Sequence, residues 1–143
     1  MIARPSGELT ETMTDDRGDA FPRINGRYSG QAYRYVYSAH WGNDVTFGPA
    51  MKHDMHRQTT EVHDYGRGRM TSEPVSVRKS GATVEDEGWI MSSVYDRNGN
   101  LSDVVILDAQ DFAGEPIATI RLPVRVPHGF HGGWAPDKIT VVE

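Results

Sequence analysis

The chain contains no cysteine, and this absence removes several kinds of chemistry. Without thiols it cannot form disulfides, thiolate metal sites or a cysteine nucleophile. It also has no surplus of positive charge, because 15 basic residues are set against 20 acidic ones and the formal net charge is -5. No basic stripe is available to follow a phosphate backbone, so we predict no nucleic-acid partner.

Long apolar runs are missing as well. No segment approaches the length that crosses a bilayer, and the first residues, MIARPSGELTE, lack the apolar core of a signal peptide. We therefore expect a cytoplasmic protein. The sequence indicates no exposed amphipathic helix, so it does not predict a peripheral association with membranes and does not exclude one.

Four motifs of common enzymes do not occur: the G-x-S-x-G elbow, the phosphate loop, the H-E-x-x-H helix and G-x-G-x-x-G after a strand. The acidic run at residues 85–87 could supply acid and base carboxylates, but beside Gly88 it is more typical of a solvated loop.

What the sequence does contain is typical of an all-β protein. Its 15 glycines and 8 prolines separate short runs that are rich in Val, Ile, Thr and Tyr. The clearest run is 31–40, where Tyr33, Tyr35 and Tyr37 share one face of a predicted strand. Asn98-Gly99 lies between two alternating runs and predicts a β-hairpin with a type I′ turn.

Further strands are predicted at 46–54, 59–65, 74–79, 88–95, 101–109 and 116–122, with an extended segment at 21–24, a weak strand at 8–14 and a loop at 66–70. They fall into two groups, 21–65 and 74–122, each of about four short antiparallel strands, as in the blades of a β-propeller. A β-sandwich would produce a similar series. Two free blades would expose sheet edges, so we treat 1–143 as a single partial domain.

Histidines are the main candidates for chemistry. His128 and His131 lie in the segment 121–136, RLPVRVPHGFHGGWAP, and in an extended chain their separation of three would send them to opposite faces. His131, which is flanked by Phe130 and Gly132, is the better candidate for a metal ligand, with His128 as its outward neighbour. A zinc site from His53, His56 and His63 is conceivable, with solvent-exposed hairpin histidines as the alternative.

Six short motifs occur in an order that resembles the C-terminal part of carotenoid cleavage oxygenases, a family that includes lignostilbene dioxygenases and the retinal isomerase of the eye. They are FPRI at 21–24, SEPV at 72–75, EDEGW at 85–89, LDAQD at 107–111, EPIA at 115–118 and VPHGFHG at 126–132. An ordered set of this kind is far more specific than any one of its members. The resemblance covers the chain from about Gly7 to Pro136.

The resemblance implies the C-terminal blades of a seven-bladed propeller that holds a non-haem Fe(II) with four histidines. His131 matches the last of these ligands and is the catalytic residue it implies. Glu73 matches a glutamate that accepts a hydrogen bond from an iron-bound imidazole. Imidazole suits ferrous iron, and such a carboxylate orients the ring. The implied reaction is the cleavage of a C=C bond by O2 in a carotenoid, an apocarotenoid or a stilbene-type molecule, which are apolar substrates.

Two features depart from the family pattern. Ala20 stands where a glutamate commonly precedes the FPRI motif, and Asp19 is one position away on the other face, so we assign it no role. No motif for the other three iron ligands is present. We therefore expect this chain to be inactive alone and to need a complementing N-terminal half. The alternative is a non-catalytic β module that binds partners through its sheet edges.

Overall fold

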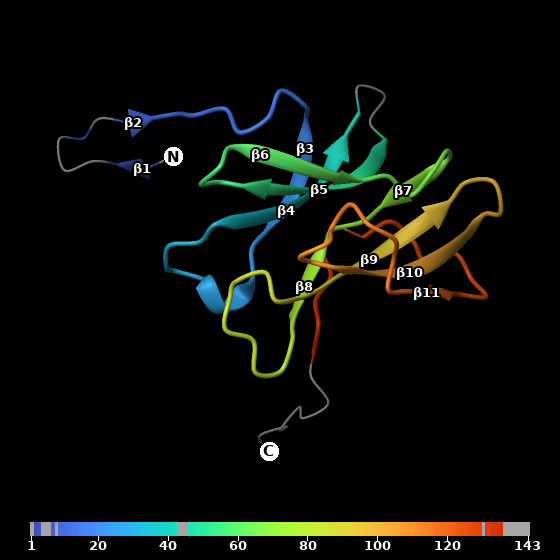
Figure 1. The fold of residues 1–143 in the computed structure, drawn as a ribbon. Helices are drawn as coiled ribbons and strands as arrows, with labels where there is room; N and C mark the ends of the chain where they lie inside the picture. The colour runs from blue at the N-terminus through green and yellow to red at the C-terminus, as the bar shows by residue number, and fades with distance from the viewer. Residues whose placement is uncertain (1, 4–6, 8, 43–45, 130, 136–143) are drawn as a thin grey trace, which may run out of the picture.

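A computed structural model describes residues 2–3, 7, 9–42, 46–129 and 131–135 of the chain. These residues form two main sheets in which every strand pair is antiparallel (Figure 1). Their only helical element is the short 3-10 turn η1 (Gly26–Tyr28). Across the described part of the chain, no helix is long and apolar enough to cross a membrane.

The first sheet has the order β3-β4-β5-β6 and is drawn in blue to green in Figure 1. Its strands are β3 (Asp19–Arg23), β4 (Tyr35–Trp41), β5 (Phe47–Asp54) and β6 (Thr59–His63). β1 (Ile2–Ala3) and β2 (Leu9–Thr10) form a separate pair, and among the described residues of the weak strand predicted at 8–14 only those of β2 form a strand. The strand predicted from residue 31 starts later, at Tyr35, and the N–H of Arg34 just before it donates to the side chain of Glu85.

The second sheet contains β7 (Arg69–Thr71), β8 (Val75–Arg78), β9 (Gly88–Asp96), β10 (Leu101–Asp108) and β11 (Ala118–Arg121). Strand β10 pairs with one edge of β9, and both β7 and β8 pair with the other edge. They act as one strand that is interrupted at residues 72–74. The loop predicted at 66–70 is wrong for its last two residues, which already pair with β9.

The hairpin predicted around Asn98-Gly99 is confirmed, but its turn is not type I′. Leu101 pairs with Asp96, which leaves residues 97–100 in the loop, and the positive φ falls on Asn100 at 51°. The side chain of Asp96 accepts the N–H of Asn98, and the N–H of Arg97 donates to Gly68 in the neighbouring strand connection. These hydrogen bonds favour a longer loop over the tight two-residue turn.

The core lies between the two sheets. Tyr37 and Ala50 from the first sheet pack against a buried cluster from the second sheet and from the loop between β10 and β11, which consists of Ile90, Val94, Val105, Leu107, Ala109 and Phe112. The rings of Tyr37 and Phe112 are 5.9 Å apart. Alternating residues of β9 and β10 supply this face, as the period of two predicts.

Polar contacts also join the sheets. Lys52 of β5 is only 3% exposed, and its Nζ donates to Asp86 at 2.9 Å and to the carbonyl of Ala109 at 2.6 Å. The carboxylate of Glu85 accepts the N–H groups of Arg34 and Tyr35. The interpretation of residues 85–87 as a solvated loop is therefore wrong, because the side chains of Glu85 and Asp86 form hydrogen bonds and an ion pair with the first sheet.

Candidate functional site

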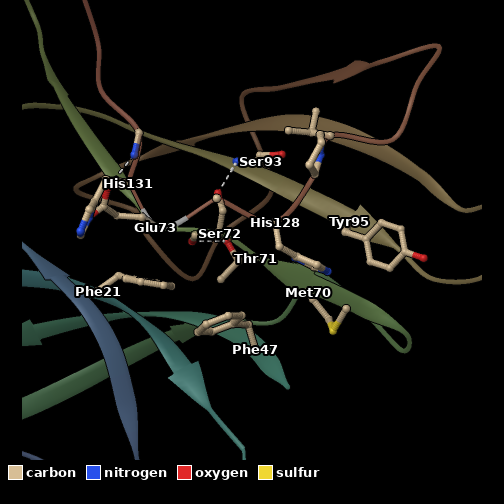
Figure 2. A pocket seen from close by; sticks show the side chains of 14 residues that line it. Phe21, Phe47, Met70, Thr71, Ser72, Glu73, Ser93, Tyr95, His128 and His131 are labelled. Atoms are coloured by element: carbon tan, nitrogen blue, oxygen red, sulfur yellow. Dashed lines mark hydrogen bonds and ion pairs between the residues drawn. The ribbon is translucent and has the colours of Figure 1, made fainter. Parts of the chain in front are cut away.

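The interruption between β7 and β8 places a buried carboxylate at the edge of the second sheet. Glu73 leaves the ladder there and is 5% exposed. The segment after β11 returns past this point, and its residues 131 and 132 meet the glutamate (Figure 2). His131 Nδ1 lies 3.0 Å from Glu73 Oε1, and the N–H of Gly132 donates to Oε2 over 2.8 Å.

Neighbouring groups stabilise the ionised form of the Glu73 carboxyl. Burial opposes its ionisation, but the N–H of Gly132, the ring of His131 and the guanidinium of Arg23 outweigh that effect and lower the pKa of the carboxyl. Arg23 Nη1 lies 3.3 Å from Oε1. An ionised carboxylate can only accept hydrogen bonds, so a neutral His131 ring donates through Nδ1 and keeps its lone pair on Nε2.

This arrangement suits one ligand of a metal site. A metal-binding imidazole commonly donates its other N–H to a carboxylate, and the His131 side chain is 73% exposed and accessible. The described residues contain no cluster of three or more potential metal ligands. They therefore fit a single imidazole ligand for iron and do not fit a complete coordination set.

A cavity of about 180 Å³ adjoins the pair and is lined by residues of both sheets and of the segment after β11. Most of its wall is apolar or aromatic, and Figure 2 shows rings from both sheets around it. The residues that line it include Phe21, Phe47, Met70, Tyr95, Val126 and His128. The arrangement can hold an apolar molecule beside an imidazole, with few polar groups to orient it.

The prediction that His128 and His131 point to opposite faces is wrong. Both line this cavity, and the ring of His128 lies edge-on to Tyr95 with centroids 5.7 Å apart. The described residues between β11 and residue 135 form no strand. Pro123 and Pro127 lack the N–H that a ladder needs, so regular alternation does not apply.

The three histidines of the conceivable zinc site do not meet, and only one matches the exposed alternative. His53 is buried, with Nε2 at 2.9 Å from Ser38 Oγ and 3.2 Å from Asp19 Oδ2. His63 is buried against aromatic rings, and burial lowers its pKa. His56 is exposed in the turn after β5.

The contacts of His53 with Ser38 and Asp19 do not make a hydrolytic triad. Ser38 and Asp19 both approach Nε2 of His53, whereas a triad needs them on different ring nitrogens, and Ser38 is fully buried. The position before the FPRI motif, Ala20, pairs with Ala39 in the first sheet. Asp19 is engaged with His53, so the structure offers no substitute there for the family's glutamate.

Sequence reasoning missed Phe21, Arg23 and Phe47. Phe21 and Arg23 belong to the FPRI motif, one of the six that carry the family resemblance, but the motif implies no role for either side chain. Their approach to Glu73 and His131 joins residues far apart in the sequence, 50 positions apart for Arg23 and Glu73 and more for Phe21 and His131. Phe47 carried no signal beyond strand propensity.

Comparison with known proteins identifies the group to which this chain is related. The model of the family described as retinal pigment epithelial membrane protein matches residues 2–136. The apocarotenoid-15,15'-oxygenase of Synechocystis sp. is 32% identical over 118 residues, which cover 80% of this chain and 24% of that protein. The carotenoid cleavage oxygenase of Mycobacterium tuberculosis is 35% identical over 138 residues, covering 92% and 27%.

Solved structures agree with the fold. A cobalt-substituted Synechocystis apocarotenoid oxygenase superposes with a TM-score of 0.86 at 28% identity, over 91% of this chain and 28% of that one. The predicted all-β fold of propeller blades is thereby confirmed. The chain spans about a quarter of the length of the curated relatives that it matches. It belongs to the retinal pigment epithelial membrane protein family, and the curated relatives named above are carotenoid or apocarotenoid oxygenases.

Proposed function

We propose that this chain is the C-terminal part of an iron-dependent oxygenase that cleaves a C=C bond in a carotenoid, an apocarotenoid or a stilbene-type molecule. The observation that carries the proposal is the contact of Glu73 with His131 and Gly132 at the wall of an apolar cavity. The related proteins are named as enzymes that act on carotenoids or apocarotenoids. The cytoplasmic location stays a prediction.

His131 would hold the iron through Nε2. Glu73 would keep the other ring nitrogen protonated and would balance part of the positive charge that a metal brings. When bound, Fe(II) would supply the activation of O2 that oxidative cleavage needs. The chain's own rings, Phe21, Phe47 and Tyr95, would bind the apolar substrate beside that point and exclude water from it.

The remaining ligands would come from a complementing N-terminal half. The second sheet offers a surface for such a partner, because the face of β9 and β10 that points away from the core is half-buried and mostly apolar. Met91 pairs with Ile106 on that face, and Val104 pairs with Ile120, which is 51% exposed. Burial of these side chains against further sheet would favour assembly.

Complementation tests the proposal. The 143-residue chain would be mixed with the part of the Synechocystis apocarotenoid oxygenase that it does not match. Iron content and loss of polyene absorbance would be measured for each part and for the mixture. We expect neither part alone to retain iron through dialysis, and the mixture to bind it and to cleave an apocarotenoid.

Two variants make the test specific to residue 131. His131→Ala should abolish iron retention in the mixture, whereas His128→Ala, which alters a histidine of the same cavity, should leave it intact. Stoichiometric iron and alkene cleavage by the 143-residue chain alone would contradict the proposal that it needs a partner. Equal iron loss in both variants would contradict the assignment of His131.

A non-catalytic β module is the second candidate, and the apolar edge of the second sheet favours it. Ile120 lies in the outer strand β11 and Ile117 lies just before it, and each side chain is more than half exposed. Pairing of this edge with another chain would cover them. Sedimentation velocity distinguishes the candidates: stable self-association of the isolated chain that survives when the N-terminal part is added would support the module.

A further inference from the structure

The backbone of Phe21 has an unusual conformation for a large side chain. Its φ is 55°, in the left-handed region, and the pairing of β3 with β4 shifts register between Ala20 and Arg23. Bulky residues rarely adopt this conformation, and the following proline restricts it further. Residues held in this way cluster at functional sites, where surrounding contacts keep the costly geometry in place.

The irregular strand directs two side chains towards the Glu73–His131 pair. The ring of Phe21 meets the ring of His131 edge-on, with centroids 6.0 Å apart and planes at 77°. Two residues later, the guanidinium of Arg23 reaches the Glu73 oxygen that also contacts His131 Nδ1. Figure 2 shows Phe21 on the side of His131 that faces the first sheet, with Phe47 beside it.

Phe21 is itself in contact with a second aromatic ring of the first sheet. Its ring lies 5.0 Å from that of Phe47, and Phe47 lies 4.8 Å from Trp41 in an edge-on contact. Trp41, Phe47 and Phe21 thus form a row of aromatic rings across the first sheet, and the row ends on His131. The contacts at the two ends of the row are edge-on and the middle one is tilted by 33°; aromatic pairs prefer edge-on and offset arrangements, so each ring restricts the ring that it touches.

His131 needs such a restriction. Its side chain is 73% exposed, and its one hydrogen bond to Glu73 fixes Nδ1 but leaves the plane of the ring free to turn about that bond. A second contact from a different direction removes this freedom. Phe21 supplies it, and Phe47 prevents Phe21 from moving away.

We propose that Phe21 is a positioning residue for His131: its strained backbone holds an aromatic ring against the imidazole so that Nε2 keeps one direction. The importance of that direction for iron rests on the proposed function. The orientation itself is a property of this chain and can be measured without metal.

The experiment compares ring-removing and ring-keeping variants by NMR. Phe21→Asn removes the ring but suits a left-handed backbone, whereas Phe21→Tyr keeps the ring. Long-range proton–nitrogen spectra of the 143-residue chain, recorded at a pH above the usual pKa of imidazole, report the tautomer of His131. The signals of the His131 ring are assigned as those that disappear in the variant His131→Gln. Nuclear Overhauser effects and ¹⁵N relaxation report contact and motion of its ring.

We expect the wild type and Phe21→Tyr to show one dominant Nδ1–H tautomer and a contact between rings 21 and 131. In Phe21→Asn the chemical shifts of Nδ1 and Nε2 of His131 should move towards each other, because both tautomers become populated, and the motion of the His131 ring should increase. Tyr33→Asn, which removes an exposed tyrosine outside the cavity, is the matched control and should change neither signal. Phe47→Leu leaves the backbone of Phe21 unaltered and should loosen His131 to a smaller extent.

An unchanged tautomer ratio and unchanged ring motion in a folded Phe21→Asn would overturn the proposal. If that variant does not fold, Phe47→Leu decides instead, and a rigid His131 in it would overturn the proposal equally. In the complemented protein, loss of the Phe21 ring should weaken Fe(II) binding by about tenfold, as for other groups that orient a metal ligand. A failure to bind iron with every chain, wild type included, would count against the proposed function and leave the NMR result standing.

Discussion

Lys52 is the position where a single substitution should damage the fold most clearly. Its ammonium is buried between the sheets, where it contacts Asp86 and the carbonyl of Ala109 and lies 4.3 Å from the centre of the Tyr35 ring. Lys52→Met keeps most of the side-chain volume and removes the charge. Asp86 then loses its partner while it remains largely buried, and the Ala109 carbonyl loses its donor.

The expected cost follows from these contacts. Removing one member of a buried ion pair typically costs about 3–5 kcal/mol, because the other charge is left without compensation. The Asp86 side chain is 12% exposed and keeps some access to water, so we expect the lower end, about 3 kcal/mol. With a urea m-value of about 2 kcal/mol/M, the midpoint should fall by about 1.5 M.

Urea unfolding followed by tryptophan fluorescence would measure this change. Glu61→Gln is the matched control, because Glu61 is also an ion-pair partner of Lys52 but is 47% exposed and 3.7 Å away, and its loss should cost less than about 1 kcal/mol. The double variant Lys52→Met/Asp86→Asn should recover about 2 kcal/mol relative to the sum of the single changes. A cost below about 1 kcal/mol for Lys52→Met, or no coupling with Asp86, would refute the assignment of this contact as the main polar link between the sheets.

Three smaller effects can be measured with the same unfolding assay. The guanidinium of Arg34 holds the pKa of the Asp54 carboxyl well below its usual range, so the unfolded chain takes up a proton first as pH falls. The stabilisation is complete above about pH 4 and is lost below it, and Asp54→Asn should flatten that acid dependence. Ser92 Oγ is buried beside the Tyr65 hydroxyl without a hydrogen bond of good geometry, so Ser92→Ala should change the free energy of unfolding by less than about 1 kcal/mol, and a larger loss would reveal a hydrogen bond to that hydroxyl or a bridging water. Gln58 has a φ of 54° in the exposed turn after β5, so Gln58→Gly should raise stability by about 0.5 kcal/mol; no gain would mean that the entropy of glycine cancels the relieved strain.

Much of the fold could be predicted from local patterns. Alternation in 88–95 and 101–109 predicted two long strands, and Asn-Gly predicted the hairpin between them, all of which the structure contains. The short strand β7 was missed because three residues carry too little periodicity to separate strand from loop. The burial of Glu85 and Asp86 was missed because it depends on Lys52 and on backbone groups of another sheet.

The candidate site was only partly predictable. Composition left His128 and His131 as equal candidates, the residues beside His131 favoured it, and its assignment as a ligand with Glu73 as its partner came from the family resemblance. The contact itself joins residues 58 positions apart, which no local rule reaches. The left-handed backbone of Phe21 was also beyond the sequence, because a phenylalanine before a proline indicates an extended chain.

The three groups of the site share one structural origin, which explains why the regular patterns did not reveal it. Phe21 lies in a register shift of β3, Glu73 in the gap between β7 and β8, and His131 in a segment without a strand. A regular strand can place side chains only on the two faces of its sheet, and here one face of each sheet is taken up by the core between them. Side chains that converge between sheet edges must therefore come from places where the ladder is broken. Each break costs stability, so a substitution such as Phe21→Gly, which relieves the backbone, is expected to weaken the hold on His131 even where it leaves the fold as stable as before.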